Sequence, residues 1–167
     1  MRKDAYLAET ARLGTFVSVE EFLTLHSKFS SVVDFKVGAN MFLFRLGIKP
    51  MWEEMPNGAT WSIKIKRSVK FDFDLAWKKT MLLCIGENLF VTHVAGCALN
   101  CRPGVIGISV WFESIPHPVD QFKILELLKT TLNLPVDTIM EFKEHSASII
   151  DGSSSMRARR FSITSNS

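Results

Sequence analysis

The stretch Pro50-Met51-Trp52-Glu53-Glu54-Met55-Pro56-Asn57-Gly58 separates two strand-like segments, and the patterns on either side of it decide the fold. Two prolines and a glycine restrict the stretch to a loop. On this loop the indole of Trp52 stands beside the carboxylate of Glu53. An aromatic ring can stack on a cation, and a carboxylate accepts hydrogen bonds from N–H groups. The pair is therefore typical of a site that holds a flat cationic heterocycle.

Strand patterns lie on both sides of the loop. Residues 60–66 alternate strictly between apolar and polar side chains, and residues 41–46 form an apolar run that ends at Gly47. Pro103-Gly104 joins two further runs, residues 91–102 and 105–113, which predicts a hairpin. In its second strand Trp111 lies on the face that carries small and polar neighbours. Residues 138–144 form one more predicted strand.

Helical patterns occur at three places. Ser18 and Glu21 form a capping box at the start of one helix, and apolar residues at helical spacing predict others over residues 72–86 and 118–132. Strands and helices alternate in short blocks without strict βαβ periodicity, and the hairpin indicates antiparallel pairing. We therefore predict an α+β fold in which a curved antiparallel sheet is backed by about three helices on one face.

Composition restricts the kind of protein further. With 47% hydrophobic and 22% charged residues among 167, the chain suits a single folded domain. A net charge of +3 and a pI near 8.8 are too mild for non-specific coating of long nucleic acid, but they leave room for a pocket that binds a few phosphates. We predict a divergent or flexible segment at residues 1–14, the binding domain at 15–146, and a serine- and arginine-rich loop and tail at 147–167. In that tail, the region of Phe161 is a candidate for returning to the sheet.

Neither a metal centre nor a membrane segment is predicted. Cys84, Cys97 and Cys101 have no zinc-site spacing and are best interpreted as buried thiols. The apolar runs are too short to span a bilayer, and the N-terminus does not resemble a secretory signal. We expect a soluble, cytoplasmic monomer without a cofactor.

Several of these residues together resemble one family. The run Gly47-Ile48-Lys49-Pro50-Met51-Trp52-Glu53-Glu54, then Trp61, then Trp77 leading to Leu82-Leu83-Cys84-Ile85-Gly86-Glu87, and Arg102 nine residues before Trp111 closely resemble eukaryotic translation initiation factor 4E. The resemblance extends over about residues 17–161. It implies a curved antiparallel sheet with three helices on its convex side. It also implies binding of the 7-methylguanosine cap of messenger RNA in translation initiation.

The resemblance implies a role for each matching side chain. Trp52 matches the second of two tryptophans that sandwich the methylated guanine, and Glu53 matches the carboxylate that accepts hydrogen bonds from the guanine N1–H and N2–H. Trp111 matches the tryptophan beside the N7-methyl group, and Arg102 matches an arginine that binds the triphosphate. The place of the first sandwich tryptophan falls near Tyr6.

The chain departs from the family pattern at the phosphates. Gly107 stands where the family has a lysine, and Thr60 where an arginine is common. Weaker phosphate contacts could therefore come from Lys64 and from the tail arginines Arg157 and Arg159.

The chain also departs at the surface where the family docks partners. The resemblance implies that a 4G-type scaffold or a 4E-binding protein docks through a short helix on Val19, Leu23, Trp77 and Lys78. Leu23 replaces the family's tryptophan, and Lys78 replaces a leucine. We expect Trp77 to be a packing residue that is half exposed at this groove.

Other functions remain open on the sequence alone. A cap-binding repressor or storage factor would use the same pocket without the scaffold, and a cap-deficient protein would use only its helical face. An isolated Trp52-Glu53 pair would more often be a half-buried loop aromatic with a solvated neighbour. A nucleotide hydrolase using Glu53, Glu54 and a histidine is disfavoured, because the sequence lacks an acidic metal-binding cluster, a phosphate-binding glycine loop and a nucleophile motif.

Overall fold

The computed structural model describes residues 10–91, 93–153 and 156–163, and the chain forms two compact units, Met1–Ser31 and Val32–Ser167. The first unit contains helix α2 (Val19–His26). The Ser18 hydroxyl caps this helix by accepting a hydrogen bond from the Glu21 N–H at 3.2 Å, which confirms the predicted start. Aromatic rings at neighbouring positions contact one another along the unit: Phe16, Phe22, His26 and Phe29.

The second unit is built on a six-stranded sheet in which every neighbouring pair of strands is antiparallel. The strand order is β1-β3-β4-β2-β5-β6. The strands are β1 (Asn40–Phe44), β2 (Ala59–Lys66), β3 (Val94–Arg102), β4 (Val105–Phe112), β5 (Ile139–Glu144) and β6 (Arg159–Ser162). Two 3-10 turns, η1 (Val32–Asp34) and η2 (Trp52–Glu54), lie in the connections. The predicted hairpin is the β3–β4 pair, which turns at Pro103 and Gly104.

The two faces of the sheet differ in chemistry. Residues that are directly paired across an antiparallel ladder project from the same face, and successive residues alternate. Trp61, Ile63 and Ile65 of β2 project from one face, here called the apolar face, and each is at most 2% exposed. Ser62 and Lys64 project from the other, here called the polar face.

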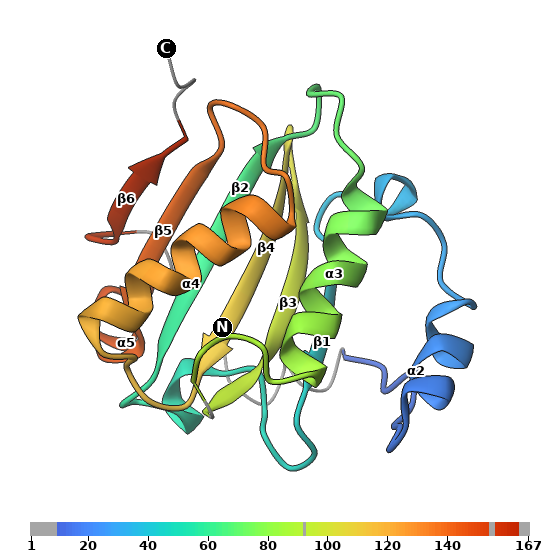
Figure 1. Cartoon of the computed structure of the whole chain (residues 1–167), viewed down its shortest axis with the longest axis horizontal. Helices are drawn as coiled ribbons and strands as arrows, with labels where there is room; N and C mark the ends of the chain where they lie inside the picture. The colour runs from blue at the N-terminus through green and yellow to red at the C-terminus, as the bar shows by residue number, and fades with distance from the viewer. Residues whose placement is uncertain (1–9, 92, 154–155, 164–167) are drawn as a thin grey trace. The chain divides into compact units, whose positions relative to one another are not determined.

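Two helices cover the apolar face. Helices α3 (Phe73–Ile85) and α4 (Pro118–Thr131) cross the same side of the sheet in Figure 1. Cys84 of α3 meets Cys97, which is paired with Val110 on the apolar face. Burial, and then this contact, raise the pKa of the Cys97 thiol, so the thiol stays protonated. The predicted α+β class, with a curved antiparallel sheet and helices on one face, is confirmed.

Two aromatic side chains on these helices differ from the sequence interpretation. Trp77 is only 3% exposed, because it shares the sheet-facing side of α3 with Phe73, Met81 and Cys84 at helical spacing. The expectation that it is half exposed is therefore wrong. Phe122, an aromatic residue within the predicted helix over residues 118–132, is 61% exposed, since the buried stripe of α4 runs through Gln121, Ile124, Leu125 and Leu128.

The segment predicted as a loop and tail contains most of a short helix and a strand. Helix α5 (His145–Asp151) follows β5 directly and ends at Gly152, whose φ of 60° suits glycine. Strand β6 then pairs with β5, and Phe161 lies opposite Met140. The serine-rich composition concealed α5, because its stability comes from tertiary contacts of Asp151 and His145 rather than from helix propensity. No helix in the described part of the chain is long and apolar enough to cross a membrane.

Candidate functional site

The site is built around the loop that carries Trp52 and Glu53. Both residues lie in η2, where the backbone turns tightly: the Met55 N–H donates to the Trp52 carbonyl at 3.1 Å, and the Gly58 N–H donates to the Met55 carbonyl at 2.9 Å. Trp52 is half-buried and Glu53 is exposed. The loop therefore presents an indole and a carboxylate from adjacent positions, and β2 begins directly after it at Ala59.

Trp111 joins the same aromatic cluster. It lies near the end of β4 on the polar face, and its indole N–H donates to the Ser109 hydroxyl at 3.1 Å. Met55, Ala95 and Trp111 form the buried part of this cluster, against which three partly buried side chains pack: Phe44, Ile48 and Trp52. The fold thus unites two tryptophans that the sequence separates by 59 residues.

His145 links this loop to the sheet. Its Nδ1 lies 2.8 Å from the Met55 carbonyl and its Nε2 lies 2.7 Å from the Thr60 hydroxyl. Since a carbonyl only accepts, Nδ1 carries the proton and Nε2 accepts from Thr60. The ring is fully buried and contacts Trp111 with centroids 5.0 Å apart. Burial lowers the pKa of His145, although its hydrogen bond to Met55 opposes that shift, so the imidazole is held neutral.

Gly58 makes the close approach of His145 possible. A Cβ at this position would lie 2.2 Å from the Phe112 carbonyl oxygen and 2.7 Å from His145 Nδ1. Neither distance is tolerable, and the first involves backbone that cannot turn aside. The glycine that the sequence marks as a turn residue is thus required by packing.

Arg102 lies on the polar face next to the turn of the β3–β4 hairpin, at the end of β4 opposite to Trp111. Its guanidinium is exposed and donates to the Asn40 side-chain oxygen at 2.9 Å. It pairs with Val105, six residues from Trp111 along β4, which corresponds to roughly 20 Å. Only an elongated ligand that runs along the sheet could contact both Trp111 and Arg102.

The positions where the sequence lacks cationic residues are filled by other contacts. Thr60 is buried and committed to His145. Gly107 faces Asn100 across the β3–β4 ladder, and a Cβ on Gly107 would lie 2.4 Å from the Asn100 side-chain oxygen. The Asn100 side chain therefore occupies the space above Gly107.

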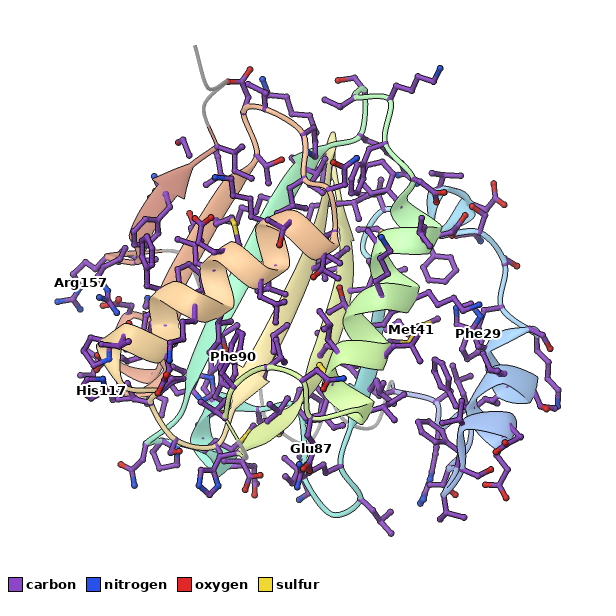
Figure 2. The ribbon with its side chains drawn as sticks, viewed as in Figure 1. Phe29, Met41, Glu87, Phe90, His117 and Arg157 are labelled. Carbon is purple, nitrogen blue, oxygen red and sulfur yellow. The ribbon has the colours of Figure 1, made fainter. Side chains whose placement is uncertain are left out.

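The three weaker phosphate candidates have different positions. Lys64, on the polar face, lies 2.6 Å from a carboxylate oxygen of Glu141. Arg157 pairs with Asp151, and Figure 2 shows its side chain at the edge of the molecule beside α5. Arg159 projects from the opposite, apolar face, where it stacks on Phe142 at 4.7 Å and donates to Gln121 of α4. The structure therefore does not bring Arg159 to the polar face.

The predicted partner-binding residues differ in exposure. Val19 and Leu23 are 51% and 42% exposed on α2, and Lys78 is partly exposed on α3. Trp77 is buried and offers no surface to a partner. Tyr6 lies outside the described residues.

Sequence reasoning missed the residues that support the site. His145 belongs to no motif that the sequence shows, and its partners are 85 and 90 residues away in the chain. Lys143 and Asp151 form a buried pair at 2.8 Å, with side chains 4% and 1% exposed. A charge such as Lys143 within a strand otherwise rich in large apolar side chains is the one signal that could have pointed to this pair. In the described ranges, no group of three His, Cys, Asp or Glu side chains is arranged to hold a metal ion.

A curved six-stranded antiparallel sheet with α3 and α4 on one face and an aromatic, carboxylate-bearing loop at the other defines an α+β ligand-binding domain. The sequence model of the family described as Eukaryotic initiation factor 4E matches residues 1–160. The chain belongs to this family.

Individual relatives agree with that assignment. Eukaryotic translation initiation factor 4E-1 of Schizosaccharomyces pombe is 32% identical over 149 residues, which cover 87% of this chain and 68% of the yeast protein. Eukaryotic translation initiation factor NCBP of Triticum aestivum is 28% identical, with 92% of this chain and 66% of the wheat protein covered. The chain thus spans about two thirds of the length of these relatives.

Solved structures match the fold. Ascaris suum eIF4E-3, in a crystal structure with the m7G cap, gives a TM-score of 0.70 at 25% identity over 80% of this chain and 77% of the other. Caenorhabditis elegans eIF4E-3, in complex with the 4E-binding protein Mextli and a cap analog, gives 0.68 at 25% identity over 79% and 77%.

Proposed function

We propose that this protein binds the 7-methylguanosine cap of messenger RNA and acts in translation initiation. The observation that carries the proposal is the packing of Trp52 in the same aromatic cluster as Trp111, with Glu53 next to Trp52 in η2. The complex of the Ascaris suum relative with the m7G cap supports it. Binding requires no covalent chemistry and no cofactor.

The physical basis of recognition is the positive charge of the methylated base. Methylation at N7 makes guanine cationic, so stacking on Trp52 gains a cation–π contribution, and Glu53 accepts charge-assisted hydrogen bonds from the N1–H and N2–H edge. Trp111 would lie beside the N7-methyl group. Unmethylated guanine is neutral, so it lacks the cation–π contribution and the attraction between a positively charged base and Glu53. The protein should therefore discriminate strongly between 7-methyl-GTP and GTP. Tyr6 remains our prediction for the second stacking aromatic.

Arg102 is our proposed ligand for the triphosphate. Its distance from Trp111 along β4 suits a bridge that runs from the base along the sheet, and its guanidinium can bind phosphate oxygens bidentately. Because Gly107 and Thr60 contribute no charge, we expect the triphosphate to be held less tightly than the base.

The protein partner is proposed to be a 4G-type scaffold or a 4E-binding protein that docks through a short helix. The complex of the Caenorhabditis elegans relative with Mextli supports this type of partner. On α2, Val19 and Leu23 expose apolar surface of the kind that an amphipathic helix covers. Since Leu23 is smaller than a tryptophan, a repressor or storage role without the usual scaffold is the second candidate function.

Tryptophan fluorescence quenching on titration with 7-methyl-GTP tests the proposal. We expect saturable quenching with 7-methyl-GTP and far weaker quenching with GTP. Trp52→Ala should lower the affinity roughly 10- to 100-fold, because stacking on one aromatic contributes about 1–3 kcal/mol. Glu53→Gln keeps the shape of the side chain but removes its charge, and it should reduce the preference for the methylated ligand.

A matched control is Glu54→Gln, which makes the same change one position further along η2. It should leave the preference for the methylated ligand unchanged. If the folded natural protein is not quenched by 7-methyl-GTP at millimolar concentration, cap binding is refuted and the helical interaction surface becomes the better explanation.

A further inference from the structure

The positive charge of the sheet is concentrated on its polar face. Among the described strand residues, five cationic side chains project from this face against one carboxylate, Glu141; the cations are Lys64, Lys66, Arg102, Lys143 and Arg160. The strand residues on the apolar face include one cation, Arg159, and one carboxylate, Glu144. The polar face therefore has an excess of four positive charges, more than the net charge of +3 of the whole chain.

Two buried carboxylates hold part of this charge in place. Glu141 is 2% exposed and lies between Lys64 Nζ, at 2.6 Å, and Arg160 Nε, at 2.8 Å. Asp151 is 1% exposed and lies between Lys143 and Arg157. Each carboxylate neutralises one of its two partners, so each group keeps one net positive charge.

These groups also present cationic side chains to solvent. The side chains of Arg160 and Arg157 are 64% and 67% exposed, and that of Lys64 is 34% exposed. Their ion pairs restrict their positions before any ligand binds, which reduces the entropic cost of contacting an anion.

The cationic side chains of β2 on the polar face lie along a line that starts near the η2 loop, and this direction suggests their ligand. Strand β2 starts directly after the η2 loop, and Lys64 and Lys66 lie on its polar face about 14 and 20 Å beyond Thr60. Arg102 of β3 projects from the same face and is separated from Lys66 by Val105 of β4, and Arg160 of β6 lies beside Glu141 of β5. At a phosphate spacing of about 3.4 Å along a duplex strand, 20 Å corresponds to roughly six phosphates, and to fewer in an extended strand.

We propose that the polar face binds the phosphodiester backbone of the RNA that follows the cap, along Lys64, Arg160 and Lys66. This inference rests on the proposed cap-binding function, because the cap would fix where the strand begins. Cations and small polar side chains are the usual contacts of a nucleic-acid backbone, and they confer affinity without sequence specificity. The affinity for capped RNA then depends on the number of backbone phosphates as well as on the methylated base.

The test compares the dissociation constants of 7-methyl-GTP and of a capped ten-nucleotide RNA at several salt concentrations. We expect the RNA to bind about tenfold more tightly at low salt. We also expect the advantage to shrink as salt rises, because each phosphate contact contributes about −0.7 to the logarithmic salt slope on a single strand. Lys66→Glu should remove most of the advantage while leaving the affinity for 7-methyl-GTP unchanged within twofold.

Lys123→Glu is the matched control. It makes the same charge change on an exposed lysine of α4, on the helix-covered side, and should keep the advantage of the RNA. Because Lys66 is exposed and outside both carboxylate groups, its substitution should not unfold the protein.

Each other outcome has a definite meaning. If 7-methyl-GTP does not bind, the proposed function fails and this inference fails with it. If 7-methyl-GTP binds but the capped RNA binds no more tightly, only the backbone path is overturned. The backbone path would also be overturned if Lys66→Glu and Lys123→Glu reduced the advantage of the capped RNA equally. It would be overturned as well if polyglutamate of the same length bound as tightly as the RNA and depended on Lys66 in the same way, because the ligand would then be an acidic peptide.

Discussion

Replacing His145 with alanine should release the η2 loop from the sheet. The substitution leaves the Met55 carbonyl and the Thr60 hydroxyl without their partner, and each stranded buried group costs about 1–3 kcal/mol. It also removes a fully buried ring that packs on Trp111, which leaves a cavity. Partial relaxation offsets some of this, and we expect a net loss of about 3–5 kcal/mol in the free energy of unfolding.

Urea denaturation followed by tryptophan fluorescence measures this loss. With a slope near 2 kcal/mol per molar, a loss of about 4 kcal/mol lowers the midpoint by roughly 2 M. His93→Ala, at an exposed histidine, should change the free energy of unfolding by less than about 0.5 kcal/mol. If His145→Ala costs less than about 1 kcal/mol, the two hydrogen bonds do not hold the loop and the reasoning fails.

The same residue gives stability a pH dependence. Burial lowers the pKa of His145 in the folded protein below its ordinary value near 6.5, so the unfolded state takes up a proton first as the pH falls. The stability that His145 contributes is complete above about pH 6.5 and is lost as the pH falls through the folded-state pKa. The natural protein should therefore lose stability more steeply than His145→Gln between pH 7.5 and 5. Parallel losses would contradict this assignment.

Three further substitutions test the packing around the site, each by urea denaturation. Asp151→Asn should cost about 3 kcal/mol, because it leaves buried Lys143 without its counter-charge, and a loss that 1 M salt abolishes would argue against a buried pair. Gly58→Ala should cost roughly 3 kcal/mol or more, since its Cβ would meet a backbone oxygen at 2.2 Å, and a cost below about 0.5 kcal/mol would exclude that clash. Gly107→Ala should cost about 1–2 kcal/mol in the natural protein and much less in an Asn100→Ala background, because the obstructing atoms belong to the Asn100 side chain. If the costs of the two substitutions simply added, the clash would be refuted.

Much of the architecture could be predicted because it depends on local periodicity. The alternation over residues 60–66 is strand β2, and the Ser18 capping box starts α2. The apolar stripe over residues 118–132 is α4, even though Phe122 lies outside it. Prediction failed where stability comes from distant contacts, as in α5, whose Asp151 and His145 bind partners outside the helix.

Arg159 and Trp77 show the same limit for single residues. Their types suggested a phosphate ligand and a half-exposed partner contact. The face of β6 from which Arg159 projects depends on pairing register, because a shift of one residue exchanges the two faces. Trp77 is buried because α3 turns that side of its stripe to the sheet. The residue types alone determine neither the pairing register of a strand nor the rotation of a helix about its axis.

The sequence by itself determined the α+β class, the loop on which Trp52 and Glu53 are adjacent, and the resemblance that led to the family. These features depend on residues close together in the chain and on backbone preferences that act over a few positions. Only the tertiary structure decided that Trp111 joins Trp52, that His145 is held neutral beneath their loop, and that the cations of four strands gather on one face. The physical reason is that burial, hydrogen-bond partners and the summed field of charges depend on distances across the sheet, which strand order and register set.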